Sequence, residues 1–317
     1  MVCQGDFNIN IVGVGFLGGS IANTLLKNKV KFNAYDITDY QNIKCHGRFN
    51  FFRCLSNLVV NSESNEFNDF NECNTNVYFI CVPTPSCENG ECDTSIVKSV
   101  VKRLSELITR KSIIIVKSTV EPGTTRKLNE IYSNENLDIV FCPEFLREIR
   151  ANEDMYNADF SLFGTNGNVD LNNSLKKLFK NVIYKHRKLN FFEKIFSKSI
   201  FKSHFGSFEE MELFKYTVNT FLATKVWYFN KIYEVCEGLN IDYQKFKRLF
   251  PLEERLGTSY GHQVPGYDGK FGAGGSCLIK DPLGMCALQE KLNISSIVLD
   301  EIMTENYIYR EKIVRKE

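Results

Sequence analysis

The chain has 317 residues, which is enough for two domains that each bury a core of their own. Its 39 Lys and Arg against 38 Asp and Glu give a formal net charge of +1, which argues against a protein built mainly to bind nucleic acid. With 43% hydrophobic and 24% charged residues, the composition is that of an ordinary globular enzyme.

The eleven cysteines and the apolar runs exclude several other classes of protein. The cysteines are scattered, and the sequence has no pair of Cys-x-x-Cys motifs that would indicate zinc, so we expect no metal site. The first ten residues lack the basic start and long apolar run of a signal peptide, and no apolar run approaches the roughly 20 residues that span a bilayer. We therefore expect a cytoplasmic protein with reduced cysteines and no membrane partner.

In the first half of the chain, short β-rich runs alternate with helical patterns, which predicts an α/β fold with a Rossmann-like, doubly wound parallel sheet. The predicted strands cover residues 8–14, 31–35, 77–82, 112–117, 137–142 and 160–164. Helices are predicted over residues 17–27 and 94–109, and the polar stretch 61–76 is expected to be a surface loop.

Residues 176–202 carry nine Lys or Arg and a single acidic residue, Glu193. This segment is either a solvated helix and loop face or a basic patch that attracts an anionic substrate. We place the domain boundary just after it, between Lys198 and Ser207. The sequence thus predicts an NAD-binding domain at 1–203 and a helical, central dimerisation domain at 204–317.

The second half begins with a helix start signal. Residues 207–210, Ser-Phe-Glu-Glu, match a capping box, in which Ser207 and Glu210 satisfy each other's backbone donors. Apolar residues then recur at helical spacing up to Gly238, which would end a helix of about 30 residues, or roughly 45 Å. Such a helix is more typical of the spine of a domain or dimer than of a sheet crossover. A last helix is expected from near Ser295.

A dinucleotide-binding pattern opens the chain, where glycines separate the first predicted strand from the first predicted helix. The glycines permit a tight turn and close approach of a pyrophosphate, and the helix N-terminus attracts its charge. Asp36 ends the next strand, where its carboxylate would bind ribose hydroxyls and repel a 2′-phosphate, so we predict NAD in preference to NADP. The expected cofactor-binding residues here are Gly13, Gly15, Phe16, Leu17, Gly18 and Asp36.

Three further clusters follow three successive predicted strands. They are residues 83–85 (Pro-Thr-Pro), 117–124 (Lys-Ser-Thr-Val-Glu-Pro-Gly-Thr) and 143–148 (Pro-Glu-Phe-Leu-Arg-Glu). Each cluster taken alone is equally well a strand-end turn. Because the carboxyl ends of parallel strands meet at one edge of a sheet, where such sheets bind ligands, three in succession favour a shared cleft.

Two sequence patterns in the second half of the chain suggest catalytic chemistry. Lys215 and Asn219, four residues apart on the long helix, are either a solvated polar pair or a catalytic pair, since burial lets lysine take a proton from an alcohol. In residues 271–281 (Phe-Gly-Ala-Gly-Gly-Ser-Cys-Leu-Ile-Lys-Asp), Cys277 follows glycines and precedes a cation. A thiol beside a cation ionises more easily, and the thiolate attacks carbon. With the glycine turn, this predicts a dehydrogenase that captures its aldehyde on sulfur.

In order and approximate spacing, these motifs resemble those of the UDP-glucose/GDP-mannose dehydrogenases. The resemblance extends from about residue 8 to residue 306, and the Cys277 run and residues 143–148 are its most specific parts. It implies a four-electron oxidation of a nucleotide sugar from CH2OH to carboxylate with two NAD. UDP-glucose is the first candidate substrate.

Carried over residue by residue, the resemblance implies a role for each matched catalytic residue. Lys215 would assist deprotonation of the alcohol, while Asn219 orients the oxygen of the reacting centre. Cys277 would add to the aldehyde as a thiohemiacetal and then carry a thioester. The residues implied for hydrolysis of that thioester are Glu144, with Thr119 and Asp281 positioning water.

The resemblance also implies the contacts with ligands and with a partner subunit. Further cofactor contacts would come from Pro83, Thr84, Thr119, Glu148 and Lys280, the last two near the nicotinamide. Backbone at 145–147 would hold the diphosphate, and Arg255 would reach the substrate of the other subunit of a homodimer. The implied substrate-binding residues are Glu144, Phe145, Leu146, Arg147, Lys215, Asn219, Arg255, Phe271, Gly272 and Gly274.

Four departures from the family pattern bear on these expectations. Ile149 stands where glycine is usual, and Ala158-Asp159-Phe160 stands where the family has Pro-Asp-Arg. The loop before Cys277, residues 265–272, is longer than the usual glycine run. Family members also continue into a further nucleotide-binding domain after the point where this chain ends, so we expect that domain to be absent here.

Two other functions remain open from the sequence. A β-hydroxyacid dehydrogenase shares the Rossmann domain, long helix and Lys–Asn pair, but it needs no cysteine nucleophile and removes only two electrons. A truncated, non-catalytic dinucleotide-binding subunit would need none of the residues Glu144, Lys215, Asn219, Cys277 and Asp281, all of which are present.

Overall fold

The computed structural model describes residues 6–38, 43, 49–64, 75–184, 201–257 and 260–311. The chain forms two compact units, the first comprising Met1–Thr84 and Asp93–Lys215 and the second Pro85–Cys92 and Tyr216–Glu317. The boundary predicted at 203/204 falls inside β8 (Lys202–Gly206), an edge strand of the first unit's sheet. The first unit therefore continues to Lys215, about two turns into the long helix α8 (Phe208–Gly238).

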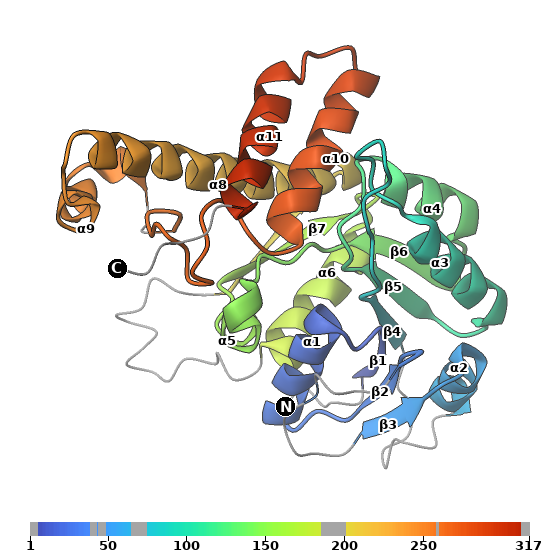
Figure 1. The fold of residues 1–317 in the computed structure, drawn as a ribbon. Helices are drawn as coiled ribbons and strands as arrows, with labels where there is room; N and C mark the ends of the chain where they lie inside the picture. Colours follow the sequence, from blue (N-terminus) through green and yellow to red (C-terminus); the bar gives the residue numbers. More distant parts are fainter. Residues whose placement is uncertain are drawn as a thin grey trace. The chain divides into compact units, whose positions relative to one another are not determined.

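The first unit is built on an eight-stranded sheet with the order β3-β2-β1-β4-β5-β6-β7-β8 (Figure 1). All neighbouring pairs are parallel except β6 and β7, which are antiparallel. The predicted doubly wound α/β sheet is thus confirmed. Its other strands are β1 (Phe7–Val12), β2 (Phe32–Tyr35), β3 (Phe49–Phe52), β4 (Thr75–Ile80), β5 (Ser112–Val116), β6 (Leu137–Phe141) and β7 (Phe160–Gly164).

Helices cover both faces of this sheet (Figure 1). One face packs against α1 (Phe16–Lys27), α6 (Val169–Leu178) and the π-helical segment η3 (Phe179–Ile183). The other packs against α2 (Leu55–Ser64), α3 (Ser95–Leu107) and α4 (Thr124–Tyr132). The short helices η2 (Glu148–Arg150) and α5 (Ala151–Tyr156) follow β6.

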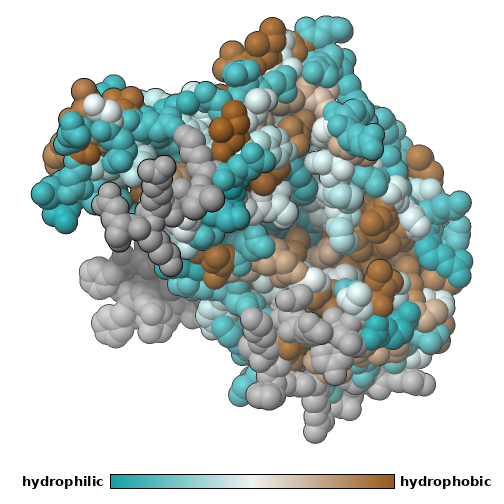
Figure 2. All heavy atoms as spheres, in the orientation of Figure 1, coloured by the Kyte–Doolittle hydropathy of each residue, from teal (hydrophilic) through white to brown (hydrophobic). Residues whose placement is uncertain are grey.

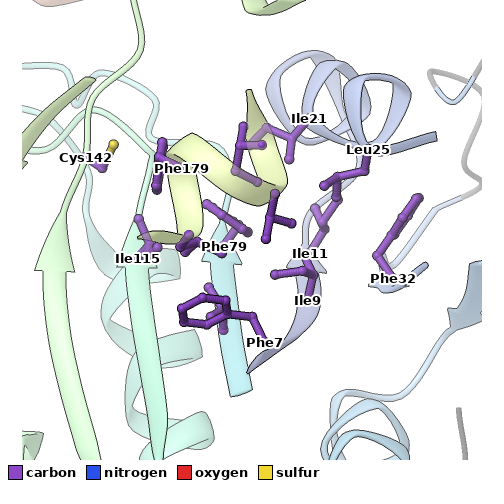
Figure 3. Packing of buried hydrophobic residues seen from close by; sticks show 14 of the residues in the cluster. Phe7, Ile9, Ile11, Ile21, Leu25, Phe32, Phe79, Ile115, Cys142 and Phe179 are labelled. Carbon is purple, nitrogen blue, oxygen red and sulfur yellow. The ribbon is translucent and has the colours of Figure 1, made fainter. Parts of the chain in front are cut away.

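The first core is an apolar layer between the sheet and α1, α6 and η3. Each of its large side chains contributes about 1.5–3 kcal/mol when fully buried. The described part of the basic segment is a solvated helix face, because Phe179 of η3 is buried in this layer while Lys176, Lys177 and Lys180 stay exposed. Residues 185–200 of that segment lie outside the described residues. Figure 3 labels members of the layer from β1, α1, β2, β4, β5 and η3: Phe7, Ile9, Ile11, Ile21, Leu25, Phe32, Phe79, Ile115 and Phe179.

A polar row lies on the opposite face of the same strands. Asn10 and Asn33 are register partners on β1 and β2, and Asn33 Nδ2 donates to Asn10 Oδ1 at 3.0 Å. Asn50 on β3 donates to Asn33 at 3.2 Å, and Asn8 on β1 donates to Asn76 on β4 at 3.1 Å. Five asparagines on four adjacent strands therefore form an asparagine ladder, which pairs polar groups that burial would otherwise leave unsatisfied.

The expectation of a surface loop at 61–76 was wrong for the described part of that stretch. Residues 61–64 are the last turn of α2, Thr75 and Asn76 begin β4, and residues 65–74 lie outside the described residues. Ser62 is fully buried, and its hydroxyl accepts from Asn8 at 3.0 Å and Asn10 at 2.9 Å. The polar side chains that suggested a loop here bond to the asparagine ladder.

The predicted long helix is confirmed as α8, with 31 residues. Its capping box is also present, since Ser207 N donates to Glu210 Oε2 at 2.7 Å and Glu210 N to Ser207 Oγ at 3.2 Å. The second unit adds α9 (Tyr243–Phe246), α10 (Cys277–Lys291) and α11 (Ile297–Glu311), with the 3₁₀ helices η5 (Lys247–Leu252) and η6 (Glu254–Leu256). Its core contains Phe229, Cys236, Tyr243, Phe250 and Val264.

The face shown in Figure 2 is a mixture of hydrophilic and hydrophobic side chains, and one of several hydrophobic groups lies near the turn between α10 and α11. The exposed apolar residues at that turn are Leu292, Ile294, Ile297 and Val298. Within the described ranges, no helix is both long enough and apolar enough to cross a membrane.

Candidate active site

The glycine turn lies at the carboxyl end of β1, in the first unit. Gly13 has φ +91°, and a Cβ there would approach Cys81 O to 2.6 Å, so both the conformation and the space require glycine. A Cβ on Gly18 would lie 1.9 Å from Gly13 O, which explains why α1 can pack so closely on this turn. A Cβ on Gly15 would meet nothing within 4 Å. The turn therefore leaves open space at the N-terminus of α1, as a bound pyrophosphate requires.

Asp36, at the end of β2, points its carboxylate back at this turn. Its Oδ2 accepts from Val14 N at 2.7 Å, and its Oδ1 accepts from Thr38 N at 2.9 Å and Thr38 Oγ1 at 3.0 Å. These bonds fix the side chain and leave acceptor capacity on Oδ2. The residues present thus fit the adenosine ribose and pyrophosphate of NAD.

Glu148 lies beside the same turn. It lines a cavity of about 350 Å³ together with Phe16 and Ser20 of α1 and with Ile149. Ile149, which replaces the family's usual glycine, is 71% exposed. The prediction of Glu148 as a cofactor contact is therefore compatible with its position next to α1.

The three clusters at strand ends do follow parallel strands, as predicted, namely β4, β5 and β6. Ser118 Oγ donates to Val82 O at 2.7 Å, which ties the segment after β5 to the end of β4. Lys117 is buried and its Nζ donates to Pro143 O at 3.2 Å, which ties the same segment to the end of β6. Thr84 and Thr119 are both buried within this edge.

Lys215 forms a buried ion pair with Glu144, within the first unit. Its Nζ donates to Glu144 O at 2.5 Å and lies 3.2 Å from Glu144 Oε1, with the two side chains 3% and 10% exposed. The same Nζ lies 5.3 Å from the ring centroid of Phe145. Glu144 Oε2 accepts from Leu146 N at 2.6 Å. The solvated alternative for Lys215 is thus wrong, because the amine is desolvated and held against a carboxylate.

Arg147 is occupied by another partner. Its guanidinium bonds both oxygens of Asp154, at 2.5 and 2.9 Å, and its backbone N donates to Asp154 Oδ2 at 2.8 Å. Burial favours a raised pKa for the Asp154 carboxyl, but these bonds from Arg147 outweigh it and lower the pKa. Because the amides of Leu146 and Arg147 already donate to carboxylates, a diphosphate bound at 145–147 would have to displace those partners. Phe160, in place of the family's arginine, packs against Phe145 with the two tilted rings 5.6 Å apart between centroids.

In the second unit, Asp281 is a buried carboxylate held on both sides. Its Oδ2 accepts from Asn219 Nδ2 at 2.5 Å, and its Oδ1 accepts from Lys280 Nζ at 2.5 Å. Asp281 is 1% exposed. Cys277 is the first residue of α10 rather than part of a loop, so Lys280 and Asp281 stand one turn after it on the same face. Cys277 thus lies at the N-terminal end of a helix, where the helix dipole is positive.

The glycine run before Cys277 is fastened to α11. Ala273 N donates to Asn306 Oδ1 at 2.7 Å, and Asn306 Nδ2 returns a bond to Ala273 O at 3.1 Å. A Cβ on Gly272 would lie 2.7 Å from Asn306 Oδ1, and one on Gly274 would lie 2.8 Å from Arg310 Nη1. Phe271 packs on Tyr233. The sequence analysis missed Asn306 and Arg310. The detectable signal was an asparagine among the apolar positions of the last predicted helix.

The predicted site residues thus fall into two groups, one in each unit. Arg255 lies in η6, where its side chain is 88% exposed and pairs with Glu253 at 2.8 Å. Its role towards a partner subunit stays a prediction. The first unit contains Gly13, Gly15, Phe16, Leu17, Gly18, Asp36, Pro83, Thr84, Thr119, Glu144, Phe145, Leu146, Arg147, Glu148 and Lys215, and the second contains Asn219, Arg255, Phe271, Gly272, Gly274, Cys277, Lys280 and Asp281.

The parallel sheet, the glycine turn and Asp36 define a dinucleotide-binding protein of the Rossmann class. The description "UDP-glucose/GDP-mannose dehydrogenase family, NAD binding domain" matches residues 7–183, and that of the family's central domain matches residues 209–307. The chain therefore belongs to the UDP-glucose/GDP-mannose dehydrogenase family, and NAD is the cofactor of its first domain.

Individual relatives agree with this assignment. The UDP-glucose 6-dehydrogenase of Rickettsia prowazekii (strain Madrid E) is 30% identical over 259 residues, covering 81% of this chain and 54% of the relative. The chain spans about half the length of the curated relatives it matches.

Among solved structures, a UDP-glucose dehydrogenase from Pyrobaculum islandicum superposes with a TM-score of 0.75 at 22% identity, over 97% of this chain and 70% of that one. A 3-hydroxyisobutyrate dehydrogenase from Mycobacterium tuberculosis superposes with a TM-score of 0.66 at 14% identity, over 95% and 93%. Both likenesses concern the fold alone.

We expect Asp36→Asn to weaken NAD binding and to reduce the preference for NAD over NADP. Loss of a charged acceptor to a ribose hydroxyl removes about 1.5–3 kcal/mol, or about a tenfold to a hundredfold in Kd. Isothermal titration with each dinucleotide measures both effects, and Asp93→Asn, an exposed carboxylate bonded to Ser95, is the control. An unchanged Kd for NAD in Asp36→Asn would show that this carboxylate does not bind the ribose.

Proposed function

We propose that this chain catalyses the NAD-dependent oxidation of a nucleotide sugar at C6, from CH2OH to carboxylate, with UDP-glucose as the preferred candidate and UDP-glucuronate as its product. One substrate, two NAD⁺ and one water would give the carboxylate, two NADH and three protons. The observation that carries the proposal is Cys277 at the start of α10, one turn before a buried carboxylate that is bonded to Lys280 and Asn219. When bound, NAD⁺ supplies the hydride acceptor for each oxidation.

In the first oxidation, Lys215 takes the proton of the C6 hydroxyl as the hydride leaves. A lysine amine takes such a proton in its uncharged form. Its bonds to Glu144 fix Nζ in one position. Asn219 Nδ2 donates one hydrogen to Asp281. Its second amide hydrogen would orient the sugar oxygen.

In the second oxidation, the Cys277 sulfur forms a bond to the aldehyde carbon while the carbonyl oxygen takes up the thiol proton, and the resulting thiohemiacetal loses a hydride and its hydroxyl proton to become a thioester. Covalent attachment prevents the aldehyde from leaving between the two oxidations. Water then adds to the thioester, and the carbon–sulfur bond breaks to release the carboxylate. One proton of the water restores the Cys277 thiol and the other is released. Glu144 would assist as base, with Thr119 and Asp281 positioning the water.

The compartment and the assembly are also proposals. The eight cysteines within the described residues are all free, which fits a reducing cytoplasm. In the second unit, α8 exposes Phe221, Tyr228 and Val235, which are seven residues apart and so form one stripe. We infer that a second copy covers this stripe in a two-fold dimer, in which the exposed Arg255 would serve the other subunit's substrate.

We expect Phe221→Arg to convert the dimer to a monomer, because a charge in the centre of an apolar contact has no partner. Size-exclusion chromatography with light scattering measures the mass. Ile131→Arg, at an exposed isoleucine of α4, should leave the mass unchanged. A wild-type protein that is monomeric at all accessible concentrations would contradict the dimer.

The proposed activity is tested with a panel of nucleotide sugars, comprising UDP-glucose, GDP-mannose and N-acetylated UDP-hexosamines. NADH absorbance gives the number of reducing equivalents, and mass spectrometry identifies the product. Two NADH and a carboxylate per sugar support the proposal. One NADH per substrate would favour the two-electron β-hydroxyacid dehydrogenase instead. NAD binding without turnover or binding of any nucleotide sugar would favour a non-catalytic subunit.

A further inference from the structure

Glu212 is a buried carboxylate for which the proposed reaction has no role. It lies on α8 within the first unit, one turn before Lys215, and is completely inaccessible to solvent. Its Oε2 accepts from Gly123 N at 2.6 Å, and its Oε1 accepts from Thr125 N at 2.9 Å. The two carboxylate oxygens thus hold two backbone donors of a distant segment.

Those two donors belong to the start of α4. Gly123 is the N-cap residue, with φ +91°, and it has no side chain to bond the free N–H groups of the first turn. Glu212 reaches across from α8 and supplies the missing acceptor, and its negative charge suits a helix N-terminus. The carboxylate is therefore an N-cap provided by another helix.

The segment that Glu212 holds is the one that contains Thr119. Residues 117–123 connect β5 to α4, and Ser118 Oγ bonds Val82 O at 2.7 Å near the beginning of the segment. Glu212 secures its far end at Gly123. Three residues after Glu212 on α8, Lys215 is bonded to Glu144. One turn of helix thus links the Thr119 segment to the Lys215–Glu144 pair.

We propose that Glu212 is a positioning residue, which in its ionised form locks residues 117–123 onto α8 and so fixes Thr119 relative to Lys215 and Glu144. This inference rests on the proposed function, in which those three residues act on the substrate.

The charges around Glu212 come from both helices. Glu209 lies on α8, while Arg126 on α4 is paired with Glu209 and with Glu130. Burial raises the pKa of Glu212 to about 7, the hydrogen bonds from Thr125 and Gly123 oppose that rise, and Glu209 adds to it. The cap is therefore fully ionised only above about pH 7.

Stability and function then depend on pH in opposite directions. Because the pKa of folded Glu212 exceeds its ordinary value of 4.5, the associated stability is complete below about pH 4.5 and is lost as the pH rises through about 7. An ordinary exposed cap would have a lowered pKa and would gain stability as the pH rises. The ionised form of Glu212, which positions the segment, is therefore the form that stabilises the fold least.

The test compares wild type, Glu212→Gln and Glu212→Asp with Glu130→Gln as the control, from about pH 5 to about pH 9. We expect wild-type kcat to rise through an apparent pKa near 7. In Glu212→Gln this rise of kcat with pH (the pH limb) should be absent. At about pH 8 its kcat should be about tenfold to a hundredfold lower than that of wild type, with little change in KM for NAD. Glu212→Asp should restore part of the limb, and Glu130→Gln should behave as wild type.

Two measurements do not depend on turnover. The Tm advantage of wild type over Glu212→Gln should shrink between about pH 5 and about pH 8. Amide hydrogen exchange over residues 117–125 at about pH 8 should be faster in Glu212→Gln. If wild type has no activity but exchange responds in this way, the proposed function fails and the Glu212 link stands. Unchanged exchange, or full kcat with an intact pH limb in Glu212→Gln, would overturn the positioning role.

Discussion

Cys277→Ala is expected to abolish carboxylate formation, by about a thousandfold or more, while leaving the affinity for NAD unchanged. The sulfur is needed to retain the half-oxidised carbon, whereas the cofactor turn at Gly13–Gly18 lies in the other unit of the chain. Product analysis by mass spectrometry and titration with NAD measure the two quantities. Intact-protein mass after mixing wild type with UDP-glucose and NAD⁺ should also reveal an adduct on Cys277.

A second cysteine provides the control for this experiment. Cys54 is exposed, and bonds from Ser56 and the Asn57 amide lower the pKa of its thiol, so it is the described surface cysteine best suited to react nonspecifically. Cys54→Ser should leave both carboxylate formation and the adduct unchanged. Full carboxylate production by Cys277→Ala, or an adduct that disappears with Cys54→Ser, would exclude the covalent mechanism.

Lys215→Met should reduce the first hydride transfer by about a hundredfold to ten-thousandfold, because the alcohol loses its base. Methionine retains most of the buried volume but removes the cation that is bonded to Glu144. Glu144→Gln is the informative comparison, since an amide can still accept from Lys215 but cannot act as a base. We expect Glu144→Gln to complete both oxidations once and then stop, with two NADH per active site and a thioester on Cys277.

Rapid-mixing measurement of NADH separates these two variants. A burst in Glu144→Gln and its absence in Lys215→Met would agree with the assigned roles. If Glu144→Gln showed no burst while Lys215→Met turned over at the wild-type rate, the roles would have to be exchanged or abandoned. Thermal denaturation of both variants controls for the loss of the buried ion pair, which is strongly destabilising when only one partner is removed.

The sequence was sufficient for the parts of the fold that depend on local pattern. The strands β4, β5 and β6 each contain a run of at least three apolar residues, as expected for strands buried on both faces, and the capping box marked the start of α8. The glycine turn and Asp36 were predictable because their spacing is set by a tight turn and one helix. The family resemblance added the roles of Glu144, Lys215 and Cys277.

What the sequence did not predict depends on contacts between distant segments. The end of α2 looked like a loop because Asn and Ser favour turns, and only the asparagine ladder explains why Ser62 is buried in a helix. Cys277 opening a helix was hidden by the glycines before it and by Pro282, which lies inside α10 although proline is unfavourable in a helix interior. Glu212 resembled any other acidic residue near a helix start, because its partners lie 87 and 89 residues away.

The asparagine ladder constrains how this sheet can change by mutation. Replacing Asn10 alone by leucine would leave the amides of Asn33 and its neighbours without partners. Each unpaired group would lower the free energy of unfolding by about 1–3 kcal/mol. Replacing the whole row together with Ser62 by apolar residues of similar shape would be nearly neutral, because the partners are then removed together. Sequence drift across these four strands must therefore proceed by coupled exchanges, and asparagines at 8, 10, 33, 50 and 76 should be gained or lost together among close relatives.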